Sequence, residues 1–437
     1  MARTTDVTED PPVTRPPVAP ATTLPSQRAA GFGRGFDSLR VRNFRWFWIA
    51  YVFSFFAMQM DMLARGWLVY DLTGSGVRLG LVSLGMGLPM LVVAPVAGVL
   101  ADRFPKRNLI ILSQTLAALM TLALALLIAT HAVRFWHVML TSFLFGTAFS
   151  FSMPARQSII SELVDRSQVL NAVALGSGAM NLARVAAPAI AGLLVALVSM
   201  AGVYFAMVAL QALGVAILFL LPRDTRPRGE GAPAKRPMRI QADLLEGFRY
   251  VRRTPVLMTL ITLAFIPVLF GMPFQMLMPI FAKDVLGVGA AGLGYLLSAS
   301  GVGAILGSFL IASFGDFRHK GWLLIGAGVG FGVALILFAL TTNFGLALWW
   351  MAVVGLTSTG YMSMNNTMVQ IYAADAMRGR VISMLMMTWG LMPLGALPLG
   401  ALAERAGAPL AVVVGGAVVA GSIALWAVAR PTLRRLR

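Results

Sequence analysis

The sequence predicts an all-α integral membrane protein of twelve transmembrane helices, arranged as two pseudo-symmetric bundles of six. Of its 437 residues, 58% are hydrophobic and only 12% are charged, which is too apolar for a protein with a wet surface. Apolar runs recur along the chain, each close to the roughly 20 residues that a helix needs to cross a bilayer. These runs do not alternate polar and apolar residues, as the strands of a membrane barrel would.

Each expected span is an apolar run between polar or charged boundaries. The runs lie near 44–69, 77–101, 108–130, 136–155, 169–197, 201–222, 255–282, 290–313, 321–341, 345–368, 380–402 and 408–429. A basic, proline-containing stretch over 221–255 separates the first six from the last six. We expect five segments: a disordered cytoplasmic tail (1–35), an N-terminal six-helix bundle (36–222), a cytoplasmic linker (223–245), a C-terminal six-helix bundle (246–430) and a basic cytoplasmic tail (431–437).

The two groups of six spans resemble each other. Asp165 and Pro188 in the first group correspond to Asp375 and Pro398 in the second, at a spacing of about 210 residues. "YDLTGSG" at 70 has a similar counterpart, "KDVLGVG" at 283. Internal repeats of this kind are common in transporters, in which two bundles can rock about a shared central site.

The formal net charge of +18 is explained by the distribution of the basic residues along the chain. Most cations lie on the side of the spans that carries both termini, and the other side holds only Arg65, Arg78, Arg134, Lys283 and Arg405. This asymmetry follows the positive-inside rule, so we expect both termini in the cytoplasm, contact with anionic lipid in the cell membrane, and no nucleic-acid partner. There is no cysteine, and the histidines lack a metal-ligand spacing, so we expect no disulfide, no metal and no cofactor.

The loop after the second span concentrates charge between two apolar runs. In "AGVLADRFPKRNLI" (97–110) the notable residues are Gly98, Asp102, Arg103, Lys106 and Arg107. A glycine allows a helix to approach closely, Asp102 can face a helix N-terminus, and we expect the cations to lie in water or at lipid headgroups. A simpler alternative is that the cations only set topology.

This pattern resembles the signature loop of the major facilitator superfamily, and the resemblance extends over all the spans. "MPARQSIISELVDRSQVLNAVAL" from Met153 and "ADLLEGFRYVRRTPVL" from Ala242 are similar to the branch of enterobactin-exporter-like and drug-efflux permeases. The resemblance implies that the loop helps to latch the two halves on the cytoplasmic side, with Asp102 near 378–381. It also implies a secondary transporter. With no cysteine and one buried acid in the spans, we do not expect an intramembrane enzyme, and the lack of an extra soluble domain counts against a scaffold or sensor.

Charged residues inside a span are costly and therefore candidates for function. We expect Asp61, Arg65 and Arg184 to be the only ones, with Asp61 about 25 Å from the cytoplasmic end of its helix. Asp61 and Arg65 are four residues apart and can form a local ion pair near the outer headgroups. Alternatively, Asp61 pairs with Arg184 across two helices. In either case Asp61 is our candidate for proton coupling.

The resemblance implies that spans 1, 4, 7 and 10 line a central cavity. The candidate cavity residues are Gln59, Phe151, Ser152, Phe274, Gln275, Tyr361, Asn365 and Asn366. Aromatic bulk with a few amides suits an organic or amphiphilic compound better than a sugar or a multiply charged ion. For each of these residues alone, helix packing or interhelical hydrogen bonding is the favoured interpretation. We expect a monomeric, proton-coupled exporter of a small molecule. A proton-coupled or facilitated importer remains the alternative.

Overall fold

The computed structural model describes residues 32–222, 240–313 and 319–434, and within these ranges the chain is almost entirely helical. The elements of the N-terminal half are η1 (Phe32–Arg40), α1 (Arg42–Thr73), α2 (Gly76–Arg103), α3 (Lys106–Ala129), α4 (Phe135–Leu163), η2 (Arg166–Gln168), α5 (Val169–Leu197) and α6 (Met200–Phe219). Twelve helical segments of the described chain are long and apolar enough to cross a membrane, which confirms the predicted number of spans.

The C-terminal half begins with an amphipathic helix and continues with six spans. Its elements are α7 (Ile240–Arg253), α8 (Pro255–Ile266), η3 (Pro267–Gly271), α9 (Phe274–Ile280), η4 (Phe281–Val285), α10 (Gly289–Ser313), α11 (Lys320–Ala339), α12 (Phe344–Tyr372), α13 (Asp375–Gly390), α14 (Met392–Ala406), α15 (Ala408–Ala429) and α16 (Pro431–Arg434). Helix α7 therefore starts inside the stretch 223–245 that was expected to be a linker. Residues 1–31, part of the expected tail, lie outside the described chain.

The seventh span is interrupted by π-helical turns. It consists of α8 and α9 joined and followed by π-helical turns, with Pro267 opening the first of these turns and Pro279 inside α9. Proline cannot donate the backbone hydrogen bond that continues an α-helix, so the ladder shifts locally to a wider turn. The span nevertheless continues from Pro255 to Val285.

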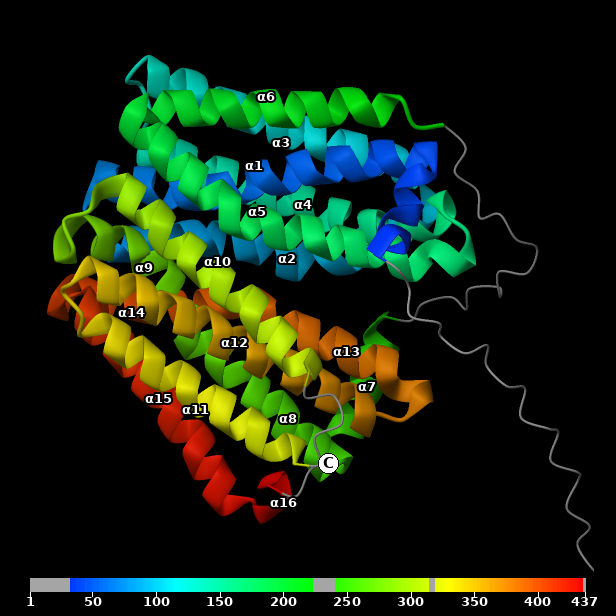
Figure 1. Cartoon of the computed structure of the whole chain (residues 1–437), viewed down its shortest axis with the longest axis vertical. Helices are drawn as coiled ribbons and strands as arrows, with labels where there is room; N and C mark the ends of the chain where they lie inside the picture. The colour runs from blue at the N-terminus through cyan, green and yellow to red at the C-terminus, as the bar shows by residue number, and fades with distance from the viewer. Residues whose placement is uncertain (1–31, 223–239, 314–318, 435–437) are drawn as a thin grey trace, which may run out of the picture.

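The two halves lie side by side and repeat the same helix packing (Figure 1). In the N-terminal half α2 packs on α4, and α3 packs on α4 and α6. In the C-terminal half α10 packs on α12, and α11 packs on α12 and α15. These are the second, third, fourth and sixth spans of each half. The matching pairs confirm two pseudo-symmetric bundles.

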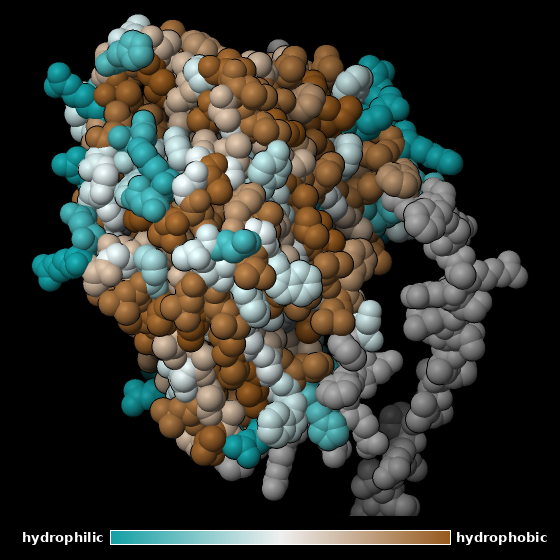
Figure 2. All heavy atoms as spheres, turned by 60° about the vertical axis from the view of Figure 1, so that its left-hand side comes forward, coloured by the Kyte–Doolittle hydropathy of each residue, from teal (hydrophilic) through white to brown (hydrophobic). Residues whose placement is uncertain are grey.

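Both halves begin and end at the same end of the bundles, because each has an even number of spans. Helix α1 begins there, and α6 and α15 end there. We call this end the terminal face and the opposite end the distal face. The surface between the two faces is mainly apolar, and hydrophilic side chains gather toward its two edges in Figure 2. This distribution is the one expected of a protein surrounded by lipid.

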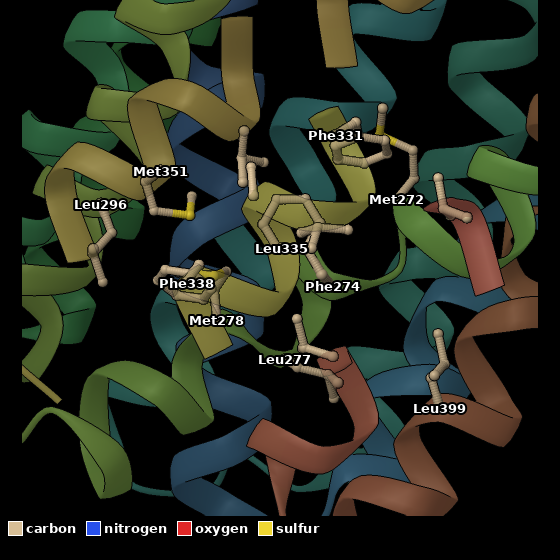
Figure 3. Packing of buried hydrophobic residues seen from close by; sticks show 14 of the residues in the cluster. Met272, Phe274, Leu277, Met278, Leu296, Phe331, Leu335, Phe338, Met351 and Leu399 are labelled. Carbon is tan, nitrogen blue, oxygen red and sulfur yellow. The ribbon is translucent and has the colours of Figure 1, made fainter. Parts of the chain in front are cut away.

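The buried core of the C-terminal half is aromatic and rich in methionine. Phe281 and Phe338 have ring centroids 4.9 Å apart, and Met278 lies beside Phe338 in the same cluster (Figure 3). Lipid tails are as apolar as these side chains, so their packing stabilises the bundle through van der Waals contact rather than through removal from water. The seventh span is thereby held firmly against α11.

The halves meet closely near the distal face. Helix α2 packs on α14, and α5 packs on α10. A Cβ atom at Gly400 would lie 2.4 Å from the carbonyl oxygen of Gly76, and one at Gly294 would lie 2.5 Å from that of Pro188. Real Cβ contacts are never so short, so any larger residue at these positions would push the two backbones apart.

Candidate functional site

A buried ion pair lies inside the N-terminal bundle. Asp61 and Arg65 on α1 are 6% and 7% exposed. The guanidinium donates two hydrogen bonds to the carboxylate, from Nε to Oδ2 and from a terminal nitrogen to Oδ1, each of 2.9 Å. This bidentate geometry is the strongest form of an arginine–carboxylate contact. It is formed by residues four apart on one helix, which share a face.

The remaining terminal nitrogen of Arg65 binds helix α4. It donates to the Ser142 hydroxyl at 2.9 Å, to the Thr141 hydroxyl at 3.1 Å and to the Val138 carbonyl at 3.4 Å. Arg65 was expected to extend outward to the headgroups, but its guanidinium turns inward to α4 instead. It ties α1 to α4 within the bundle.

The alternative pairing of Asp61 with Arg184 is not the one in the structure. Both oxygens of Asp61 are occupied by Arg65, and the Arg184 side chain is exposed on α5. Its backbone packs instead against α10, where a Cβ at Gly301 would lie 2.9 Å from the Arg184 carbonyl oxygen. A different side chain, Tyr204 of α6, is fully buried beside the ion pair, and its hydroxyl has no hydrogen-bond partner.

Polar contacts join the two halves at the distal face, and we call them the distal gate. Lys283 and Asp71 form an ion pair of 2.6 Å, and Tyr70 donates to the neighbouring Asp284. The carboxylate of Glu404 accepts from the Ser75 hydroxyl at 2.6 Å and from the amide nitrogen of residue 77 at 3.2 Å. One further contact lies deeper, from the Ser83 hydroxyl to the Met276 sulfur at 3.0 Å.

Among the described residues, the side-chain hydrogen bonds that join the two halves all belong to this distal half of the molecule. The gate therefore lies at the face opposite to the termini, where the close glycine contacts also occur.

The charged loop after α2 is only partly described. The side chains of Gly98, Asp102 and Arg103 fall within 94–103, which lies outside the described side chains, so the expected latch remains a prediction. Lys106 forms an ion pair with Glu162 of α4. Arg107 is 5% exposed, and it donates to the backbone carbonyls of Leu218 and Phe219 at the end of α6. These two cations are thus bound within the N-terminal half rather than free in water. Arg107 binds there because the end of a helix offers carbonyls that lack intrahelical partners.

The expected cavity residues are scattered. Phe274 and Tyr361 are 3% and 1% exposed in the packed core, where Tyr361 donates to the Leu263 carbonyl at 2.7 Å. Phe274 lies near Leu335 in Figure 3. Asn365 is also buried, and its Oδ1 has no partner. The side chains that are partly exposed are Gln59, Phe151, Gln275 and Asn366.

Ser152 lies in a different place, a partly enclosed hollow inside the N-terminal half. The hollow has a free volume of about 60 Å³ and is formed by α1, α3, α4 and α6. Arg156 reaches into it from α4 and binds the hydroxyls of Ser152 and Ser54 and the side-chain carbonyl of Gln114.

Arg156 is a charge within helix α4 that was not among the expected site residues. The fourth span was expected to end at residue 155, so Arg156 was assigned to the cytoplasmic loop. Helix α4 continues to Leu163, which places Arg156 seven residues, or about 10 Å, inside its end. The polar spacing Ser152 to Arg156, four residues apart on a helix, was the available signal.

Comparison with known proteins identifies the family. The profile of the family described as transmembrane secretion effector matches residues 34–435. The multidrug efflux pump Tap of Mycolicibacterium fortuitum is 27% identical over 334 residues, which is 75% of this chain and 80% of that protein. The enterobactin exporter EntS of Shigella flexneri is 27% identical over 323 residues, covering 71% and 72%.

The fold is shared with solved transporters. The crystal structure of the nucleoside transporter NupG has a TM-score of 0.71 and covers 90% of this chain and 99% of its own, at 15% identity. Since the family profile spans nearly the whole chain, the protein belongs to the transmembrane secretion effectors of the major facilitator superfamily, and it is a multi-pass secondary transporter of small molecules rather than an enzyme.

Proposed function

We propose that the chain exports a small organic or amphiphilic compound in exchange for protons, by alternating access. The observation that carries the proposal is the buried Asp61–Arg65 pair. Ionisable residues within a span are costly to bury, so their presence there is itself an indication of function. Export is supported by the relatives, since Tap is named as a multidrug efflux pump and EntS as an enterobactin exporter.

Alternating access is supported by the character of the distal gate. The side chains of Lys283 and Asp71 are 41% and 57% exposed, so this ion pair contributes about 1 kcal/mol at most. Contacts of this kind separate easily. The ion pair of the distal gate therefore adds little to the free energy needed to open the distal face.

In this proposal the terminal face is cytoplasmic. The described chain carries Arg42, Arg45, Arg166, Arg252 and Arg253 at that face, and basic residues next to spans favour the cytoplasmic side. The protein then lies in the cell membrane with both termini inside and anionic lipid around its basic face. One chain contains both bundles, so a monomer suffices.

The arrangement around Asp61 suits a proton carrier. When a proton neutralises the carboxylate, the charge-assisted bonds to Arg65 weaken. Arg65 keeps its bonds to Ser142 and Thr141, so it still ties α1 to α4, while the protonated side chain of Asp61 is released from the pair. Protonation of Asp61 would in this way change the polar contacts inside the N-terminal bundle and leave the helix–helix tie through Arg65 in place.

Replacing Asp61 by asparagine is expected to abolish proton-driven accumulation while leaving substrate exchange intact. The measurement uses the purified full chain in proteoliposomes with an imposed pH gradient, and enterobactin, which the relative EntS is named as exporting, as a candidate substrate. Asp37→Asn is the matched control, since Asp37 forms only a surface pair with Arg40. Uphill transport by Asp61→Asn at the rate of the control would exclude Asp61 as the coupling acid.

The direction of transport has its own test. In inverted membrane vesicles with an acidic interior, the substrate is expected to accumulate, because protons that leave the interior are exchanged for substrate that enters from the cytoplasmic face. Right-side-out vesicles with an acidic exterior are expected to show no such uptake. Uptake confined to right-side-out vesicles would contradict export and favour the importer.

A further inference from the structure

We propose that the hollow around Arg156 binds the acidic head group of an amphiphilic substrate, with Arg156 as its counter-ion. This assignment rests on the proposed transport function and specifies its substrate class. The site lies between α1, α3, α4 and α6, within the N-terminal half, and not between the two halves.

Arg156 has only neutral partners. Its Nε donates to the Ser152 hydroxyl at 2.7 Å, and one terminal nitrogen donates to the Gln114 side-chain carbonyl at 2.7 Å and to the Ser54 hydroxyl at 3.2 Å. The ring of Tyr51 lies 5.7 Å from the guanidinium carbon. No described Asp or Glu forms an ion pair with Arg156. Its positive charge is therefore not neutralised by the described chain.

The same bundle shows what a neutralised arginine looks like. Arg65 is held by the carboxylate of Asp61 and by α4 hydroxyls. Arg156 also donates to two hydroxyls, those of Ser152 and Ser54, but it has no carboxylate partner among the described residues. Arg156 is partly buried, and a cation partly withdrawn from water without a counter-charge is less favourable than a paired one, a cost that a ligand carboxylate would reduce. The comparison indicates that the missing partner of Arg156 is an anion.

A second polar group in the hollow also lacks a partner. Gln211 of α6 is 4% exposed and lines the hollow, and its Oε1 accepts no hydrogen bond. Gln114, in contrast, is held in place by Arg156 and Ser54, and it fits because residue 214 is glycine: a Cβ there would lie 2.7 Å from the Gln114 side-chain nitrogen. A ligand that brings a hydroxyl or N–H beside its carboxylate would satisfy both Arg156 and Gln211.

The rest of the wall is apolar, which determines the other end of the ligand. Phe55, Met58, Phe145 and Phe149 line the hollow together with the polar groups. A volume of about 60 Å³ accommodates a head group with a few waters but not a whole drug-sized molecule. The ligand is thus an aromatic or aliphatic acid whose carboxylate enters the hollow while its apolar body stays outside it.

The test compares two probes of the same size and ring, one with an anionic carboxylate and one with a neutral amide. 1-Hydroxy-2-naphthoate is fluorescent and carries a hydroxyl beside its carboxylate, and 1-hydroxy-2-naphthamide is its neutral analogue. Binding of both to the purified full chain in detergent is measured by fluorescence anisotropy. The wild-type protein is expected to bind the acid at least about tenfold more tightly than the amide, the usual difference for a bond to a charged group. Equal affinities, or no saturable binding of the acid, would overturn the proposal.

Variants then show which residue is responsible for the tighter binding of the acid than of the amide. Arg156→Gln is expected to remove this difference in affinity, Arg156→Lys to keep part of it, and Arg166→Gln to keep all of it. Arg166 is an exposed arginine in the same half, so it controls for net charge. The acid is also expected to raise the melting temperature of the wild type and of Arg166→Gln but not of Arg156→Gln. A preference that persists in a folded Arg156→Gln protein would contradict the assignment.

Transport assays separate this proposal from the proposed function. Selective binding of the acid without proton-driven export would leave the Arg156 site standing and overturn the exporter. Proton-driven export of neutral or cationic compounds that is unaffected by Arg156→Gln would leave the exporter standing and overturn the acid site.

Discussion

Replacing Gly400 by leucine is expected to abolish transport in a protein that still folds. The new Cβ would lie 2.4 Å from the carbonyl oxygen of Gly76, so α2 and α14 could no longer approach at the distal face. Each bundle keeps its internal packing, because this contact joins the two halves. The variant is therefore expected to remain in states that are open at the distal face.

The absence of native cysteine makes this state measurable. Ser83→Cys, which in the closed gate would face Met276, is expected to react faster with a membrane-impermeant thiol reagent when Gly400→Leu is also present. Gly421→Leu is the matched control, since a Cβ at Gly421 meets nothing within 4 Å. Normal transport by Gly400→Leu, or unchanged reactivity at position 83, would show that closure of this contact is not part of the cycle.

Replacing Arg65 by methionine is expected to destabilise the protein by about 3–5 kcal/mol, because it leaves the buried Asp61 carboxylate without a counter-ion. The double variant Asp61→Asn/Arg65→Met is expected to recover most of this loss, since neither charge then remains. Stability is measured by thermal unfolding of the purified protein in one detergent at one lipid content.

Lys283→Met is the control for this series. It also breaks an ion pair, but the pair is exposed, so the expected loss is about 1 kcal/mol or less. A loss for Arg65→Met no larger than that for Lys283→Met would mean that Asp61 reaches water in the folded protein. A double variant as unstable as Arg65→Met alone would show that the bonds of Arg65 to α4, and not its charge, hold the bundle together.

The sequence predicted the spans well because span formation is local. A run of apolar residues satisfies its own backbone hydrogen bonds within one helix, so composition and length suffice to find it. The Asp61–Arg65 pair was predictable for the same reason, since a spacing of four places both on one helix face. The repeat across the linker likewise predicted the matching helix pairs of the two bundles.

The failures concern charges whose partners are distant in sequence. The fourth span was expected to end before Arg156 because a charge inside lipid is costly. Ser54 and Gln114, from α1 and α3, supply the hydrogen bonds that let α4 continue past it. Arg107 was expected in water for a similar reason, whereas the carbonyl groups at the end of α6 bind it.

The sequence by itself therefore determined an all-helical membrane protein of twelve spans in two repeated halves, with one locally paired acid in the first span. Only the tertiary structure decided that the halves meet at the distal face and that a hollow surrounds Arg156. The physical reason is the range of the interactions. Helices form from bonds between near neighbours in the chain, whereas helix contacts and polar networks depend on residues that the fold alone brings together.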